Sequence, residues 1–187
     1  MAESASIARG GDNKCEVAYF PDDYATAYRE CLFLAMRGDA SAQSMLGSMD
    51  EDGQGTSQGY KQAVWWYRKA ADQGHEAAQI FLARMYEDGR GVPQDYGQAV
   101  RWHRMAAEQG TIGASQYSLG RMYMQGHGVP RDSVQAHLWF NLAASQFPPG
   151  KYQEAAAQAR DLVAARMPPA QVAEAQRLAR EWKPKRP

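Results

Sequence analysis

The chain lacks an excess of charge of either sign and lacks any long apolar segment. Its 187 residues include 21 Lys and Arg and 21 Asp and Glu, so the formal net charge at pH 7 is zero. The totals therefore show no excess of positive charge, which a nucleic-acid-binding protein typically has. No stretch approaches the roughly 18 consecutive apolar residues that a membrane span requires. We therefore expect neither a nucleic-acid partner nor insertion into a membrane.

An export signal is also missing from the start of the sequence. Residues 1–22 do not show basic residues followed by the apolar run of roughly 7–15 residues that is typical of signal peptides. We therefore expect a cytoplasmic protein, or a periplasmic or secreted one if a signal peptide has been trimmed from the natural chain.

Cysteine and histidine are too few and too scattered to indicate a metal site. The chain has two cysteines and four histidines. Neither a Cys-x-x-Cys nor a His-x-x-x-His pair occurs among them, and such pairs are typical of zinc ligands. We expect no metal and no other cofactor.

What the sequence does contain is a stretch of about 36 residues that recurs along the chain. The clearest copy runs from Gln79 to Gly110 and contains Leu-x-x-Met-Tyr, Gly-x-Gly-Val-Pro-x-Asp, Ala-x-x-Trp and Ala-Ala-x-Gln-Gly. One copy precedes it and another follows. A period in this range predicts an array of small units, each of which buries its apolar face against its neighbours.

Each unit has the pattern of a helical hairpin. Leu82 and Met85 lie one turn apart on the apolar face of a first helix. Gly89 suits the left-handed conformation that ends such a helix. Asp95 is predicted to cap the second helix, with Gln98 completing a capping box. The predicted full units are residues 42–74, 77–110 and 114–146.

Both ends of the chain depart from the period. Residues 24–38 align with a second helix only, so the array is predicted to begin with a half unit. A flexible leader and an extended strap are predicted over residues 1–23. After Ser145 the period is lost. Residues 147–187 are predicted to form a cap of two helices, at about 151–166 and 169–182, followed by a solvated basic tail.

Aromatic residues that recur in every second helix are expected in the core rather than in a cofactor-binding box. They are Trp66, Trp102 and Trp139. Cys31 occupies another helical packing position, where the later units carry Tyr, His or Phe. This position predicts a buried thiol. A disulfide between Cys15 and Cys31 is the alternative.

The combined pattern resembles the Sel-one-like repeat family, a branch of the tetratricopeptide-like helical solenoids. The resemblance covers about residues 24–146, although Asp50 replaces the Tyr and Thr56-Ser57 replace Val-Pro in the first full unit. It implies an all-α, right-handed superhelix of helical hairpins. It also implies an adaptor or scaffold that holds a protein or peptide partner in a concave groove, although the fold alone does not name that partner.

In such stacks the first helices line the concave side, so the candidate binding residues are first-helix positions that differ between units. They are Ser44, Ser48, Ile80, Arg84, Glu87, Asp88, Tyr117, Arg121, Met124 and Gln125. Arg84 and Arg121 lie one unit apart and could hold a carboxylate or a backbone carbonyl. The alternative is a solvated face on which arginines pair with acids three or four residues on.

Two other functions are open. Some relatives are described as penicillin-binding or β-lactamase-like hydrolases, whose serine mechanism uses Ser-x-x-Lys. No lysine in this chain has a serine three residues before it, so we predict a protein that is not an enzyme. The other possibility is self-association, because the half unit leaves an apolar flank covered only by the strap Val17–Phe20. We expect a monomer or a weak homodimer.

Overall fold

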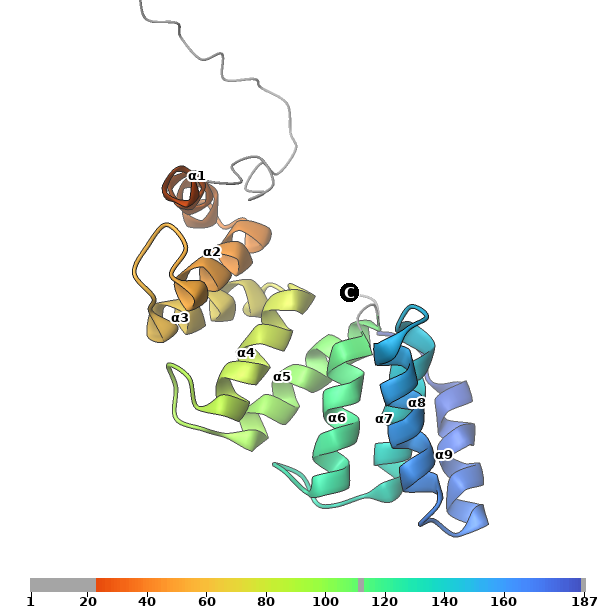
Figure 1. Cartoon of the computed structure of the whole chain (residues 1–187). Helices are drawn as coiled ribbons and strands as arrows, with labels where there is room; N and C mark the ends of the chain where they lie inside the picture. Colours follow the sequence, from red (N-terminus) through yellow and green to blue (C-terminus); the bar gives the residue numbers. More distant parts are fainter. Residues whose placement is uncertain (1–22, 111–112, 186–187) are drawn as a thin grey trace, which may run out of the picture.

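The computed structural model describes residues 23–110 and 113–185, and this part of the chain contains nine α-helices and no strand. The helices follow one another as an open array of hairpins, with α1 at one end and α8 and α9 at the other (Figure 1). They are α1 (Tyr24–Met36), α2 (Ala40–Asp52), α3 (Tyr60–Asp72), α4 (Glu76–Asp88), α5 (Tyr96–Gln109), α6 (Gly113–Gln125), α7 (Ser133–Gln146), α8 (Lys151–Ala164) and α9 (Pro169–Glu181). The predicted all-helical solenoid with C-terminal capping helices is confirmed.

Some predictions for the N-terminal segment fall outside the described residues. The predicted leader and the strap Val17–Phe20 are among them. Asp23, the last residue of that segment, is described, and its side chain accepts a hydrogen bond from the backbone N–H of Thr26 at 3.0 Å. It is therefore the N-cap of α1.

Asp95 and Asp132 cap α5 and α7 as predicted, but the capping box does not form. Asp95 Oδ1 accepts from the backbone N–H of Gln98 at 3.0 Å, which should stabilise the helix by about 1 kcal/mol. In a capping box the Gln98 side chain would accept from the Asp95 amide. That amide instead donates to the carbonyl of Tyr86 at 3.0 Å, which ties the loop back to α4. The next unit repeats these bonds at Asp132.

Glycines shape the hairpin loops at two positions. The first helices end, as predicted, at left-handed glycines, Gly53, Gly89 and Gly126. Two residues on, Gly91 has a φ of +70°, and a Cβ there would lie 2.3 Å from the carbonyl oxygen of Tyr60 at the start of α3. Gly55 and Gly128 make the same contact in their units. Each loop backbone therefore rests on the first turn of the preceding second helix.

The recurring tryptophans Trp66, Trp102 and Trp139 are buried, which confirms that they belong to the core. A small residue on the first helix allows close packing within a unit. A Cβ at Gly47 would lie 2.5 Å from the Tyr67 ring, and one at Gly120 would lie 2.7 Å from the Phe140 ring.

Cys31 is buried, as predicted, but it is not a thiol. It packs in the cluster that joins α1 to α2 and α3, and it is disulfide-bonded. The prediction of a free thiol is therefore wrong, because a packing position specifies burial and not the oxidation state of the sulfur. Cys15, the other cysteine of the sequence, lies outside the described residues.

The C-terminal helices cover α7, and the chain then returns toward α5. Trp182 packs edge-on against Trp139, with ring centroids 6.5 Å apart. Beyond it, the backbone N–H of Lys185 donates to the carbonyl of Glu108 at 2.7 Å, and the two side chains pair at 3.0 Å. Residues 183–185 of the predicted solvated tail are exposed, but the tail is also tied to α5 at Lys185, because α5 offers both a carbonyl and a carboxylate at this point.

Buried glutamines join successive units. Gln79 donates to the carbonyl of Ala71 in α3 at 3.2 Å and accepts from Gln109 of α5 at 2.9 Å. Gln43 makes the equivalent bonds one unit earlier. Gln116 occupies this position in α6 and is fully buried, but neither end of its amide has a hydrogen-bond partner in the described part of the chain. The glutamine at this repeat position therefore joins neighbouring helices by hydrogen bonds in two units, but it is an unsatisfied polar group in the third.

This difference predicts opposite effects of the same substitution. Gln79→Leu should lower the free energy of unfolding by about 1–3 kcal/mol, because it leaves the Ala71 carbonyl and the Gln109 amide unpaired. Gln116→Leu should be neutral or stabilising, because it removes an unpaired buried amide at similar volume. Urea denaturation measures both. Equal losses in the two variants would contradict the assignment.

None of the described helices has both the length and the apolar character needed to cross a bilayer.

Candidate functional site

The ten predicted groove residues lie on α2, α4 and α6, but they do not line one continuous cavity. Ser44 and Ser48 line a cavity of about 340 Å³ between α2 and α4, which we call the α2–α4 pocket. Met124 lines another, also of about 340 Å³, against α8. Ile80 and Gln125 lie on α4 and α6 outside these linings.

The other five predicted residues come together in a cavity of about 370 Å³ between α4 and α6, which we call the central pocket. Its lining consists of Arg84, Glu87, Asp88, Tyr117, Ser118 and Arg121. Ser118 was not predicted. Its equivalents in the earlier units are Met45 and Phe81, so the comparison of repeats contained the signal that would have found it.

Glu87 is engaged inside the array. Its carboxylate accepts from His103 Nε2 at 2.7 Å and pairs with the guanidinium of Arg121 from the next unit. Only 10% of its side chain is exposed. Glu87 and Arg121 therefore form a wall of the central pocket and a bridge between α4 and α6, which limits their freedom to bind a partner.

The electrostatics of Glu87 follow from these contacts. Burial disfavours its charged form, but the hydrogen bond with His103 and the hydrogen bond and positive charge of Arg121 outweigh burial, so the pKa of Glu87 lies below its ordinary value. The carboxylate is therefore ionised at neutral pH, as the bridge requires.

The residue at the position of Glu87 differs between units, and in each unit it matches the residue that it contacts on the second helix. In the first full unit Glu51 accepts from the Tyr67 hydroxyl at 3.0 Å. Burial and the neighbouring carboxylate raise the pKa of Tyr67, which keeps the phenol protonated as a donor. In the third unit the pair is Met124 and Phe140, which pack in one apolar cluster. Differences between repeats at this position thus reflect internal packing.

Arg84 differs from the other charged residues of the central pocket. Its side chain is exposed and has no hydrogen-bond or ion-pair partner among the described residues. The solvated-face alternative would pair it with Glu87 or Asp88. Glu87 is occupied as above, and Asp88 lies 3.7 Å from Arg90. The Arg84 side chain is therefore solvated, as the alternative expects, but the ion pair that the alternative predicts is absent.

The α2–α4 pocket has a more apolar lining. Met45, Met49 and Phe81 contribute to it, together with His75 at the start of α4. His75 Nδ1 accepts from the backbone N–H of Ala78 at 3.2 Å. Burial lowers the pKa of His75, which favours the neutral ring that this cap needs.

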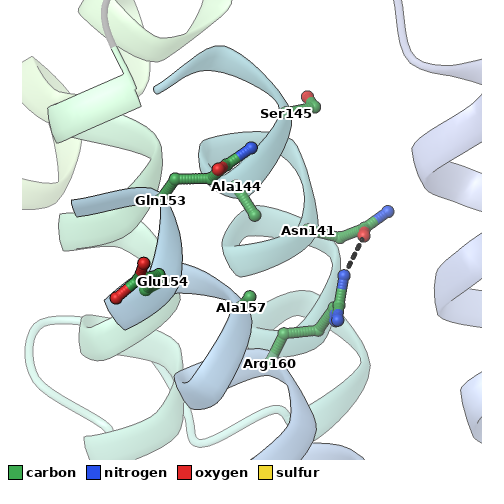
Figure 2. Close-up of a pocket in the computed structure, with 7 residues that line it drawn as sticks. All are labelled: Asn141, Ala144, Ser145, Gln153, Glu154, Ala157 and Arg160. Atoms are coloured by element: carbon green, nitrogen blue, oxygen red, sulfur yellow. Dashed lines mark hydrogen bonds between the residues drawn. The ribbon is translucent and has the colours of Figure 1, made fainter. Parts of the chain in front are cut away.

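A further cavity, of about 310 Å³, lies between α7 and α8. Figure 2 shows Arg160 and Asn141 turned toward each other, joined at 3.3 Å, while Glu154 points away from this pair. Arg160 also pairs with the neighbouring Asp161 at 2.8 Å. Its polar groups either pair with each other or point in different directions, so they do not converge on a ligand. We therefore interpret this cavity as a gap between packed helices.

One buried chain of hydrogen bonds has the residue types of a hydrolase triad. Ser115 Oγ lies 3.2 Å from His103 Nδ1, and His103 Nε2 contacts Glu87. Ser115 is 0% exposed and His103 is 1% exposed, so a substrate has no access to the hydroxyl. We interpret this chain as structural. In the described segments, no group of three or more His, Cys, Asp or Glu residues could hold a metal ion.

The bridge at Glu87 predicts a pH-dependent effect on stability. Glu87→Gln should lower the free energy of unfolding at pH 7 by about 1–3 kcal/mol, because the buried His103 and the half-exposed Arg121 lose a charged acceptor. Since the folded pKa is depressed, this contribution is present above the unfolded pKa of about 4.3 and is lost as the pH falls through the folded pKa. Urea titrations at pH 7 and pH 3, with the exposed Glu154→Gln as control, measure it. A loss that is the same at both pH values would count against the bridge.

Comparison with known proteins gives a family and a fold. The family model described as Sel1 repeat matches residues 40–75, 76–111 and 113–146, which together make up more than half of the chain. No curated protein matches.

Among the solved structures that are similar to the chain are two repeat proteins of bacteria. One is a protective antigen of uropathogenic Escherichia coli strains that displays an SLR fold, with 35% identity and a TM-score of 0.73, over 84% of this chain and 32% of that one. The other is a Sel1 repeat protein from Oxalobacter formigenes, with 28% identity and a TM-score of 0.69, over 77% of this chain and 55% of that one. The chain thus spans about a third and about half of their lengths.

Proposed function

The chain belongs to the Sel1 repeat family, and from that premise we propose that it is a non-enzymatic adaptor which binds a protein or peptide partner along its first helices. The observation that carries this proposal is the unpaired guanidinium of Arg84 in the central pocket. A charged group with no internal partner contributes little to the fold, whereas it can provide a strong contact to a partner.

The proposed binding surface is narrower than the predicted groove. Arg84, Tyr117 and Ser118 line the central pocket and have groups available for contact. Ser44 and Ser48 line the α2–α4 pocket on the neighbouring helices. Glu87, Arg121 and Met124 are left out of this surface. Glu87 and Arg121 are paired with each other in the wall of the central pocket, and Met124 lies against α8.

Binding is favoured over hydrolysis on two grounds. The chain has no Ser-x-x-Lys pair, and the buried Ser115–His103–Glu87 chain is closed to substrate. A purified sample that hydrolysed nitrocefin faster than a blank would overturn this choice. The neutral net charge supports a protein or peptide partner over nucleic acid.

Weak self-association is a second proposal, favoured by the exposed apolar residues of the half unit. Phe33 and Met36 of α1 are 59% and 76% exposed, and exposed apolar residues of this kind can support contact between copies. A sedimentation profile that stays monomeric at high concentration would exclude it.

The disulfide at Cys31 favours an oxidising compartment over the cytoplasmic location predicted from the sequence. Cytosolic thiols are normally kept reduced, whereas disulfides persist in the periplasm and outside the cell. We therefore propose an oxidising location. Cell fractionation that found the protein only in the cytoplasm would contradict it.

Charge reversal at Arg84 tests the binding surface. The full chain, its Arg84→Glu variant and its Arg180→Glu variant would each capture proteins from the organism that carries the gene, with mass spectrometry as the readout. Arg84→Glu should reduce the recovery of the wild-type partners by at least about tenfold. Arg180 is an exposed arginine on α9 and serves as the matched control.

Neither residue packs in the core, so both variants should keep the wild-type urea midpoint. Unchanged recovery of the partners with Arg84→Glu would show that this surface does not bind them. Arg121→Glu is unsuitable for the comparison, because it would also break the bridge to Glu87.

A further inference from the structure

The charges around Arg84 depart from the symmetry of the repeats. Glu51 and Glu87 occupy equivalent positions on α2 and α4. Glu87 is bound by Arg121 of the next first helix. Arg84 is the equivalent of Arg121 one unit earlier. If the repeats were symmetric, Arg84 would therefore form an ion pair with Glu51. Arg90 of the loop after α4 takes that place instead, with its guanidinium 3.7 Å from Glu51.

Arg84 also forms no ion pair with the acids of its own helix. The positions three and four residues on, where a helical ion pair would form, hold Glu87 and Asp88. Glu87 is held by His103 and Arg121, and Asp88 lies beside Arg90. A guanidinium with five donors therefore opens on the central pocket with no counter-ion among the described residues.

We propose that the central pocket recognises the carboxylate of an acidic side chain in a partner peptide, with Arg84 as its counter-ion. The inference rests on the proposed adaptor function and names the chemistry of the partner at that site. Arginine and a carboxylate can form two parallel hydrogen bonds, which supply both strength and orientation. The hydroxyls of Tyr117 and Ser118, which also line the pocket, can donate to the remaining lone pairs.

The α2–α4 pocket supplies a second contact for the same peptide. Both pockets lie between successive first helices, so they follow each other along one face of the array. Phe81 and Ser118 are repeat equivalents, and they make one pocket apolar where the other is polar. Met45, which is partly exposed, adds flexible apolar surface that adapts to different side chains. The preferred peptide therefore carries an acidic side chain and, separately, an apolar one.

A basic side chain fits this face less well. The two acids of the central pocket are Glu87 and Asp88. The first is neutralised by Arg121 within a bridge, and the second lies 3.7 Å from Arg90. A lysine or arginine from a partner would have to compete with these contacts and would meet Arg84 at the same site.

A selection with random peptides tests the proposal without knowledge of the natural partner. Peptides displayed on phage and fused through their C-termini offer side-chain carboxylates but no terminal carboxylate. The full chain and its Arg84→Ala, Arg84→Glu and Arg180→Ala variants would serve as baits. Wild type and Arg180→Ala should both select Asp or Glu at one recurring position, and Arg84→Glu should select Lys or Arg there.

Selected peptides would then be synthesised and their affinities measured. Arg84→Ala, or replacement of the peptide acid by its amide, should weaken binding at least about tenfold. Circular dichroism and the urea midpoint would verify that each variant is folded.

The outcomes separate the two levels of the proposal. Peptides selected without an acidic preference, or with affinities unaffected by Arg84→Ala, would overturn carboxylate recognition and leave the adaptor function standing. A basic preference in the wild type would overturn it as well. Failure of any peptide to bind would overturn the proposed function together with the inference.

Discussion

The array depends on the contact between each hairpin loop and the start of the preceding second helix. A single hairpin is too small to bury its own apolar face, so its stability comes from the neighbours on which it stacks. At Gly91 the loop backbone lies so close to the Tyr60 carbonyl that a Cβ has no room. The same contact at Gly55 and Gly128 sets the register between units at three points of the described chain. The other contacts between units, at Gln79 and Glu87, depend on that register.

The fold could be predicted to within a few residues because its determinants recur. Asp95, Gly89 and Trp102 each serve the same purpose in every unit that has them, so a local rule applied several times gave a consistent result. The errors lie where one residue has two possible partners. The Asp95 amide was assigned to Gln98 but is taken by Tyr86. Similarly, the position of Cys31 predicted burial but carried no information about its oxidation.

The candidate site was predictable only in part. Comparison of the repeats identified five of the six residues that line the central pocket. It did not show which of the variable residues differ because their packing partners differ, and which have a side chain without an internal partner. Glu87 varies because its partner on α5 varies, whereas Arg84 is unpaired because Arg90 occupies the carboxylate one unit earlier. That distinction needs the positions of side chains from three helices and a loop. Periodicity in one sequence does not contain it.

The measurement that tests the central claim most directly is the cost of adding one methyl group at two loop glycines. Gly74 and Gly91 both have positive φ, of +86° and +70°, but a Cβ at Gly74 meets nothing within 4 Å. Gly74→Ala should therefore cost about 1–2 kcal/mol of unfolding free energy for its left-handed backbone alone. Gly91→Ala should cost at least about 2 kcal/mol more, because the loop must also move off the Tyr60 carbonyl. Equal losses for the two variants, measured by urea denaturation, would show that this contact does not hold the units in register.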